Sequence, residues 1–224
     1  MVKKLIAKSY VWIILLIMYA PILTLIAFSF TEAKNIGSWT GFSFRLYLDM
    51  FDNEEIVEAL MNTIIVALSA GIISTILGTL GAIGIYYSKP KAKKIMNGMS
   101  QIPVLNAEIV TAISLTILFV FFGIEFNFVT LLIGHVVLTV PFVVLSVMPK
   151  LKQMDPNIYE AALDLGASPK RALWKVVLPE IMPGIFSGFM LTITLSLDDY
   201  IITAFTRNNS FSTFDFSLKH LGQP

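Results

Sequence analysis

Three acidic side chains stand inside stretches of the sequence that are otherwise apolar. Glu108 lies in a run from Ile102 to Phe122, and Asp198 and Asp199 are adjacent in a run from Met182 to Phe205. A charge in the centre of a bilayer costs at least about 2.5 to 3.5 kcal/mol, so each group needs compensation. The carboxyl groups could hydrogen-bond across a helix bundle or be protonated, or they could line a water-accessible path and attract a cation.

The spacing of these carboxyl groups predicts separate positions along such a path. At a rise of about 1.5 Å per residue, Asp198 is roughly 24 Å along its run from Met182, whereas Glu108 is near the start of its own run. Adjacent helical positions differ by about 100°, so Asp198 and Asp199 should face different neighbours. We therefore expect no compact dyad. A solute with separated ammonium groups, such as an oligoamine, would suit carboxylates at different depths.

A polar stretch, 155–179, separates two apolar runs and predicts two short helices. Asp155-Pro156 can cap and start the first helix, and Gly166 supplies the left-handed residue that ends it. Ser168-Pro169 repeats the start signal for a second helix, and Pro179 lacks the N–H donor with which that helix would continue.

The first of these helices is amphipathic in pattern. Its apolar residues recur at i, i+3, i+4 and i+7, at Ile158, Ala161, Ala162 and Leu165, while Asn157, Glu160 and Asp164 point elsewhere. Periodicity alone leaves three interpretations open: a helix on the membrane surface, an ordinary loop, or a surface for a partner.

The composition places these residues in a membrane protein. The chain has 224 residues, of which 56% are hydrophobic and 14% charged, with a mean hydropathy of +0.78. A soluble domain of this size is less apolar, so we expect an all-α polytopic membrane protein forming one domain over 1–224. The net charge of +1 gives no case for nucleic-acid binding, and the absence of cysteine excludes disulfides and thiolate chemistry. His135 and His220 are not spaced as a metal pair, and His135 is predicted to be a hydrogen-bonded packing residue.

Five apolar stretches are long enough to cross a bilayer. They are residues 10–30, 62–87, 102–122, 128–148 and 182–205, with a connecting loop at 149–181. The first resembles a signal peptide at its charged start, but its apolar run is too long, so we expect an uncleaved span. In the second, Ala70, Ser74, Gly78 and Ala82 recur at intervals of four, which predicts close packing against another helix.

Lys and Arg collect on one side of these spans. With the N-terminus in the cytoplasm, twelve of these residues fall on inside segments and four on outside segments. This distribution predicts a cytoplasmic N-terminus and a cytoplasmic 149–181 loop. The outside loop 31–61 is acidic and rich in aromatic residues, which favours anchoring at the membrane interface, although it could also receive a partner or a cation.

The polar stretch resembles the EAA loop of permease subunits of binding-protein-dependent ABC importers. The matching residues are Glu160-Ala161-Ala162, Gly166, Val176 and Leu178-Pro179. The resemblance implies a helix bundle of the type I ABC importer permease kind, with five spans visible and the sixth span of the family missing after Thr206. The residues that it implies for coupling to an ATPase are Tyr159, Glu160, Ala161, Ala162, Leu165, Gly166, Ser168, Pro169, Leu178 and Pro179.

Other segments resemble the second permease subunit of spermidine/putrescine importers. They are 108–115, 138–144, 164–168 and 194–200, the last reading Thr-Leu-Ser-Leu-Asp-Asp-Tyr. The resemblance implies polyamine as the solute, and a pathway containing Glu108, Asp198, Asp199 and Tyr200. It also implies a multi-pass protein of the cytoplasmic membrane with three partners: a second permease, an ATPase dimer that binds ATP and Mg, and an extracytoplasmic polyamine-binding protein. In the resembled mechanism, closure of the ATPases rocks the permeases outward.

The chain lacks the Gly-x-x-x-x-Gly-Lys-Ser/Thr loop that cradles phosphates, and we expect it to bind no cofactor or metal and to be no enzyme. Alternatives are a permease for another solute, such as ferric ion or an organic anion, a proton-coupled secondary transporter, and an intramembrane aspartyl protease. The protease would need two carboxyl groups a few ångströms apart from separate helices, which the expected depths oppose. The secondary transporter should show internal symmetry, which the sequence lacks.

Overall fold

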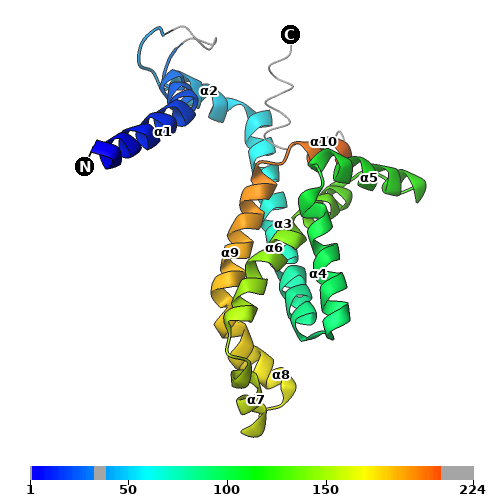
Figure 1. Cartoon of the computed structure of the whole chain (residues 1–224). Coiled ribbons are helices and arrows are strands. Elements are labelled where there is room, and N and C mark those ends of the chain that lie inside the picture. Colours follow the sequence, from blue (N-terminus) through cyan, green and yellow to red (C-terminus); the bar gives the residue numbers. More distant parts are fainter. Residues whose placement is uncertain (1, 33–38, 208–224) are drawn as a thin grey trace. The chain divides into compact units, whose positions relative to one another are not determined.

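The structure of the chain is a computed structural model that describes residues 2–32 and 39–207 (Figure 1). By its internal contacts the chain divides into two compact units, Met1–Val57 and Glu58–Pro224. The prediction of a missing sixth span concerns residues 208–224, which lie outside the described residues.

The first unit contains a long helix and a small aromatic cluster. Helix α1 (Val2–Phe28) is followed by an isolated antiparallel bridge between Thr31 and Phe42 and by the short helix α2 (Arg45–Asp52). The ring of Phe30 stacks on Phe42 at 5.5 Å between centroids and also contacts Phe44 and Tyr47. The aromatic residues of the 31–61 loop therefore pack on one another.

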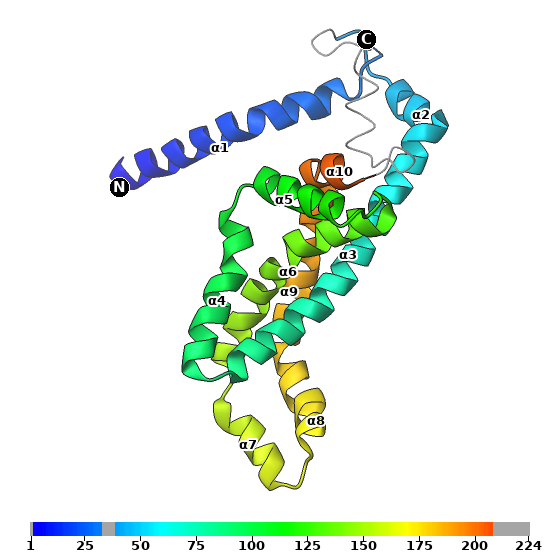
Figure 2. The ribbon, with the colours of Figure 1, turned by 90° about the vertical axis from the view of Figure 1, so that its right-hand side faces the viewer.

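The second unit is a helix bundle. It comprises most of α3 (Glu54–Tyr87), then α4 (Pro90–Leu105), α5 (Glu108–Phe121), α6 (Phe128–Gln153), α7 (Pro156–Asp164), α8 (Pro169–Ala172), the π-helical turn η1 (Leu173–Val177), α9 (Leu178–Leu197) and α10 (Ile201–Thr206). In both views α7 and α8 lie at one end of this unit, and α5 and α10 lie at the other (Figures 1 and 2).

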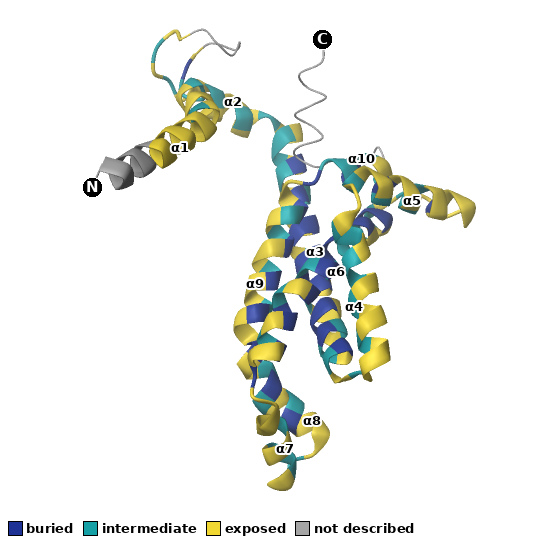
Figure 3. Ribbon diagram, viewed as in Figure 1, coloured by how far each residue is buried: buried dark blue, intermediate teal, exposed yellow. Residues whose placement is uncertain are grey.

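Helices α3, α6 and α9 form the core of the bundle. Buried residues are dark blue in Figure 3. Side chains from these three helices, with Met154 directly after α6 and Val177 of η1, form one buried cluster: Ala82, Ile85, Val143, Val144, Val147, Met148, Leu151, Met154, Val177 and Ile181. The predicted row of small residues on α3 is buried, with Ala70, Ser74 and Ala82 at 0% exposure. The expectation of close helix packing along this row is confirmed.

The described residues contain four or five candidate spans, against the five predicted, and the bounds differ from the prediction. Four helices of the described residues are long and apolar enough to cross a membrane: Tyr10–Phe28, Glu54–Tyr87, Phe128–Gln153 and Pro169–Leu197. A fifth is present only if α4 and α5 together form one span, although they meet at a bend of 103°. The chain is thus an all-α polytopic membrane protein.

The third predicted span, 102–122, is a broken helix. Asn106 and Ala107 are extended, with ψ of 145° and 137°, and α5 starts at Glu108. Asparagine competes with helical hydrogen bonding and a carboxylate is favoured in the first turn of a helix, so the sequence at 106–108 suits a stop followed by a new start.

The second helix predicted in the polar stretch does not stop at Pro179. Instead α8, η1 and α9 run without interruption from Pro169 to Leu197. Proline lacks the N–H that would bond to the carbonyl four residues earlier, and the π turn directly before it adjusts the register: the N–H of Leu178 donates to the carbonyl of Leu173, five residues back. The prediction that Pro179 ends the helix is therefore wrong, and the 149–181 loop is shorter than expected.

Candidate functional site

Helix α7 is fixed at both ends by the residues that the sequence indicates. The Asp155 carboxylate accepts a hydrogen bond from the N–H of Asn157 at 2.9 Å, and Pro156 is the first helical residue. Gly166 has a φ of +82°, and the N–H of Ala167 donates to the carbonyl of Ala162 at 3.0 Å. The capping predictions are confirmed, and α7 is a short helix with defined ends.

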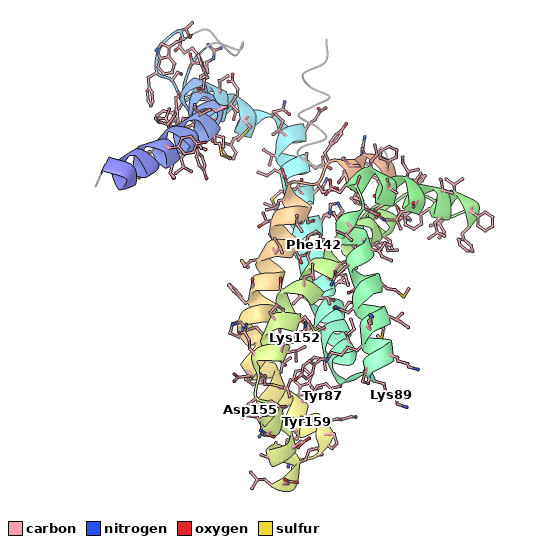
Figure 4. The ribbon with its side chains drawn as sticks, in the orientation of Figure 1. Tyr87, Lys89, Phe142, Lys152, Asp155 and Tyr159 are labelled. Atoms are coloured by element: carbon pink, nitrogen blue, oxygen red, sulfur yellow. The ribbon has the colours of Figure 1, made fainter. Side chains whose placement is uncertain are left out.

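One side of α7 rests on the bundle through aromatic rings. Tyr159 packs against the core cluster, and its ring lies 5.4 Å from that of Tyr87 at the end of α3. Tyr87 in turn meets Tyr86 edge to face at 5.0 Å, and the ammonium of Lys93 on α4 lies 4.5 Å from the centre of the Tyr86 ring. Figure 4 shows Tyr87, Lys89, Asp155 and Tyr159 gathered at this end of the bundle. These aromatic residues join α7 to the start of α4.

The other side of α7 is uncovered. Leu165 is 89% exposed, Ile158 is 38% exposed, and Glu160 and Ala161 are also exposed. Of the predicted apolar face, only Ala162 is partly covered by the bundle. An exposed large apolar residue beside a carboxylate on a rigid helix is a surface suited to docking another protein.

The remaining residues of the implied coupling set fall into different environments. Ser168 caps α8 by accepting from the N–H of Arg171 at 3.4 Å, and Pro169 is exposed in its first turn. Leu178 packs against the core cluster, and Pro179 is exposed at the start of α9. Leu178 therefore belongs to the bundle rather than to the uncovered side of α7.

At the other end of the bundle, the chain breaks at the two aspartates. Helix α9 ends at Leu197, and α10 begins at Ile201, so the predicted span 182–205 is two helices. The Asp198 side chain is exposed, whereas Asp199 is 4% exposed. The expectation that the two face different neighbours agrees with the structure.

The Asp199 carboxylate holds the first turn of α10. One oxygen accepts from the N–H of Ile202 at 3.2 Å, and the other accepts from the N–H of Thr203 at 3.0 Å. The Thr203 hydroxyl also lies 3.4 Å from this second oxygen. A carboxylate at a helix N-terminus satisfies N–H groups that have no partner within the helix and interacts favourably with the helix dipole.

His135 on α6 is the centre of the same network. Its Nδ1 lies 2.9 Å from the Ser196 hydroxyl, and its Nε2 lies 3.2 Å from the Thr203 hydroxyl and 3.6 Å from the Asp199 carboxylate. One helical turn further along α6, the Thr139 hydroxyl donates to the His135 carbonyl at 2.7 Å and pairs with the Ser74 hydroxyl of α3 at 2.8 Å. The prediction of a hydrogen-bonded packing histidine is confirmed.

Sequence reasoning missed most of this network. Ser196, Asp199, Thr203 and Thr206 are spaced at i, i+3, i+7 and i+10, which is the signal of one polar helical face. That signal could have identified the residues, because a polar stripe inside an apolar span must find partners across the bundle.

Glu108 is nearer to the aspartates than its position in the sequence predicted. The turn between α4 and α5 brings α5 against α10, and Ala112, Leu138 and Ile202 form a small buried cluster between α5, α6 and α10. Glu108 opens α5 and is half-buried. The prediction that Glu108 and the aspartates lie at different depths assumed a straight third span, and the structure shows that this span is bent. Tyr200, between the aspartates and α10, is half-buried.

The arrangement has two parts with different chemistry. One end presents a rigid amphipathic helix whose apolar side is uncovered. The other end gathers carboxyl groups around a break between two helices, a feature that membrane proteins tolerate where backbone is buried in protein or lines a cavity.

Comparison with known proteins gives consistent similarities. Residues 74–215 match the family described as binding-protein-dependent transport system inner membrane component. The chain is 34% identical over 204 residues to the spermidine/putrescine transport system permease protein PotC of Haemophilus influenzae, covering 91% of this chain and 79% of that protein. It is 33% identical over 211 residues to PotC of Escherichia coli, covering 94% and 80%. It is 31% identical over 203 residues to the putrescine transport system permease protein PotI of Escherichia coli, covering 88% and 72%.

Proposed function

Because this chain belongs to the family of binding-protein-dependent transport system inner membrane components, we propose that it is a permease subunit of an ATP-driven importer of polyamines. The observation that carries the proposal is the similarity to polyamine permeases over 88 to 94% of the chain. The family match, over residues 74–215, includes both the α7 segment and the carboxyl groups around the α9–α10 break.

In this function, α7 docks on the ATPase. Its uncovered side offers Leu165 and Ala161 as apolar contacts and Glu160 as a charged one. The N-terminus and α7 lie in the cytoplasm, as the twelve-to-four distribution of Lys and Arg favours. The ATPase dimer binds ATP and Mg, and this chain takes no part in hydrolysis.

The carboxyl groups at the far end of the bundle serve the solute. Asp198 is exposed, and Tyr200, two residues further on, is half-buried. Glu108 is half-buried at the start of α5, the helix that packs against α10. Polyamines carry ammonium groups separated by methylenes, so carboxylates attract the charges while apolar walls tolerate the methylenes. A cationic solute compensates carboxyl groups that are otherwise costly to expose inside a membrane.

The complete importer would contain further subunits in the cytoplasmic membrane. A second permease forms the other half of the path, and an extracytoplasmic binding protein delivers the polyamine. Closure of the ATPases moves α7, and the ring contacts from Tyr159 to Tyr86 pass that displacement to α3 and α4. Rocking of one helix bundle against the other then alternates access to the solute site.

Co-purification with a candidate permease partner and ATPase tests the proposal. The native chain is compared with Glu160→Lys, which reverses the charge on the uncovered side of α7, and with Gly166→Pro. Proline fixes φ near −65°, so it cannot adopt the φ of +82° at this position. We expect the native chain to recover the ATPase and both variants to lose it.

Uptake of labelled spermidine and putrescine by the recovered complex is the second half of the test. ATP-dependent uptake that unlabelled polyamine competes, and that ferric ion and organic anions do not, supports the proposed solute. Uptake without any ATPase, or peptide cleavage by the chain alone, contradicts the proposal.

A further inference from the structure

The two adjacent aspartates have opposite surroundings, and this difference assigns them different roles. We propose that Asp199 is a positioning residue that, with His135, clamps the break between α9 and α10 and thereby presents the Asp198 carboxylate to the cationic solute. The proposal rests on the proposed function, because it takes the solute to be a polyamine that passes this end of α9.

Asp199 is fully engaged within the protein. Its side chain has 0% exposure, and its two oxygens accept from the N–H groups of Ile202 and Thr203 at 3.2 and 3.0 Å. A solute could reach this carboxylate only if α10 lost its first-turn hydrogen bonds. Asp199 therefore caps the first turn of α10 and cannot contact the solute.

His135 ties the two sides of the break together. Its Nδ1 contacts Ser196, which precedes the break, at 2.9 Å, and its Nε2 contacts Thr203, which follows the break, at 3.2 Å. A neutral imidazole has one N–H and one lone pair, so one ring nitrogen donates and the other accepts. A single ring on α6 thus fixes the end of α9 relative to the start of α10.

The far end of α10 is held in the same way. The Thr116 hydroxyl of α5 donates to the Phe205 carbonyl at 3.0 Å, and the Thr130 hydroxyl of α6 donates to the Thr206 carbonyl at 3.0 Å. With both ends of α10 attached to neighbouring helices, the break at residues 198–200 has one defined geometry.

Asp198 is left as the solute-facing member of the pair. Its N–H completes α9 by donating to the Thr194 carbonyl at 3.3 Å, and its side chain is exposed. Among the described residues, its carboxylate has no hydrogen-bond partner. The clamp fixes the backbone of Asp198 and so holds its carboxylate in position. A binding group must be held in a fixed position if its contact is to distinguish one solute from another.

Uptake kinetics separate the two roles. Asp198→Asn should raise the KM for labelled spermidine about tenfold, the equivalent of about 1.4 kcal/mol, and leave Vmax little changed. Asp199→Ala and His135→Leu should lower Vmax, since they release the break. Asp199→Asn keeps one oxygen acceptor and should retain more of the Vmax than Asp199→Ala does. Glu125→Gln, which neutralises an exposed carboxylate before α6, is the control and should change neither parameter.

A readout independent of transport uses the absence of cysteine from the chain. Phe205 is 38% exposed on α10, so Phe205→Cys introduces a single thiol whose reaction rate with a maleimide reports the position of α10. Asp199→Ala and His135→Leu should change this rate at least severalfold in the purified complex. Asp198→Asn should leave it unchanged.

The outcomes distinguish the clamp from the function. If Asp199→Ala changes the thiol reaction rate and Asp198→Asn does not, the clamp is supported, even in a complex that takes up no spermidine. The absence of uptake would then count against the proposed function alone. An unchanged thiol rate in Asp199→Ala, or a raised KM with unchanged Vmax in that variant, overturns the assignment of Asp199 as a positioning residue.

Discussion

At Gly78 the backbones of α3 and α6 come so close that no side chain fits between them. A Cβ atom on this residue would lie 2.6 Å from the Cβ of Val143 and 3.1 Å from the carbonyl oxygen of Val140. The row of small residues on α3 is therefore a requirement of the packing and not only a statistical preference of membrane helices.

Gly78→Ala should lower the free energy of unfolding of the bundle by about 1 to 3 kcal/mol, the usual cost of overpacking a core. Gly84→Ala is the matched control, because it lies on the same helix and a Cβ there meets nothing within 4 Å. Thermal unfolding in detergent measures both variants. Equal melting temperatures for the two would contradict the packing described for α3 and α6.

Single residues could be predicted from sequence where their role is local. Asp155, Gly166 and Ser168 act on backbone within a few positions, and each was identified correctly. The partners of Asp199 could not be predicted, because His135 is 64 positions away and only the fold brings it there. A polar residue in an apolar run shows that a partner exists, but not which one.

At the scale of elements, α7 is connected to the membrane helices by aromatic contacts as well as by the chain. The Tyr159 ring lies 5.4 Å from that of Tyr87, and Tyr87 lies at the last position of α3. This contact is a direct route by which a displacement of α7 can reach α3.

Tyr159→Ala removes that route and should reduce polyamine uptake while the complex still retains its ATPase. An aromatic pair contributes about 0.5 to 1.5 kcal/mol beyond its buried area, so α7 would keep its helical structure but lose its fixed position. Tyr159→Phe keeps the ring and serves as the control. Uptake per bound ATPase, measured for both, checks the prediction; normal uptake by the alanine variant would show that the contact is not needed.

Hydropathy predicted the existence of the spans better than their shape. Apolar composition decides which segments can enter a membrane, and that is a property of the segment alone. The bends at residues 106–107 and 198–200, and the π turn before Pro179, depend on tertiary contacts that compensate interrupted hydrogen bonds. These contacts join helices that are far apart in the sequence, so hydropathy along the chain predicts a straight helix where the structure has a broken one.

On the scale of the whole molecule, the importer needs an exposed apolar surface on the bundle that a partner subunit buries. Leu165 is the plainest candidate on that surface, since it is 89% exposed at the end of α7. The site is chemically suited to a partner, because water solvates a leucine side chain poorly and burial of it against an ATPase would gain up to about 1.5 to 3 kcal/mol.

Leu165→Glu should therefore abolish co-purification of the ATPase. It should leave the melting temperature of the isolated chain unchanged, because a substitution at so exposed a position changes the free energy of unfolding by less than about 0.5 kcal/mol. Lys91→Gln, at an exposed position in the first turn of α4, changes the net charge by the same one unit and is the control. It should recover the ATPase at the native level. Loss of the ATPase from both variants would mean that general electrostatics, rather than the uncovered side of α7, govern association. Loss from Leu165→Glu alone places the ATPase contact on α7, at the opposite end of the bundle from the Asp199 clamp.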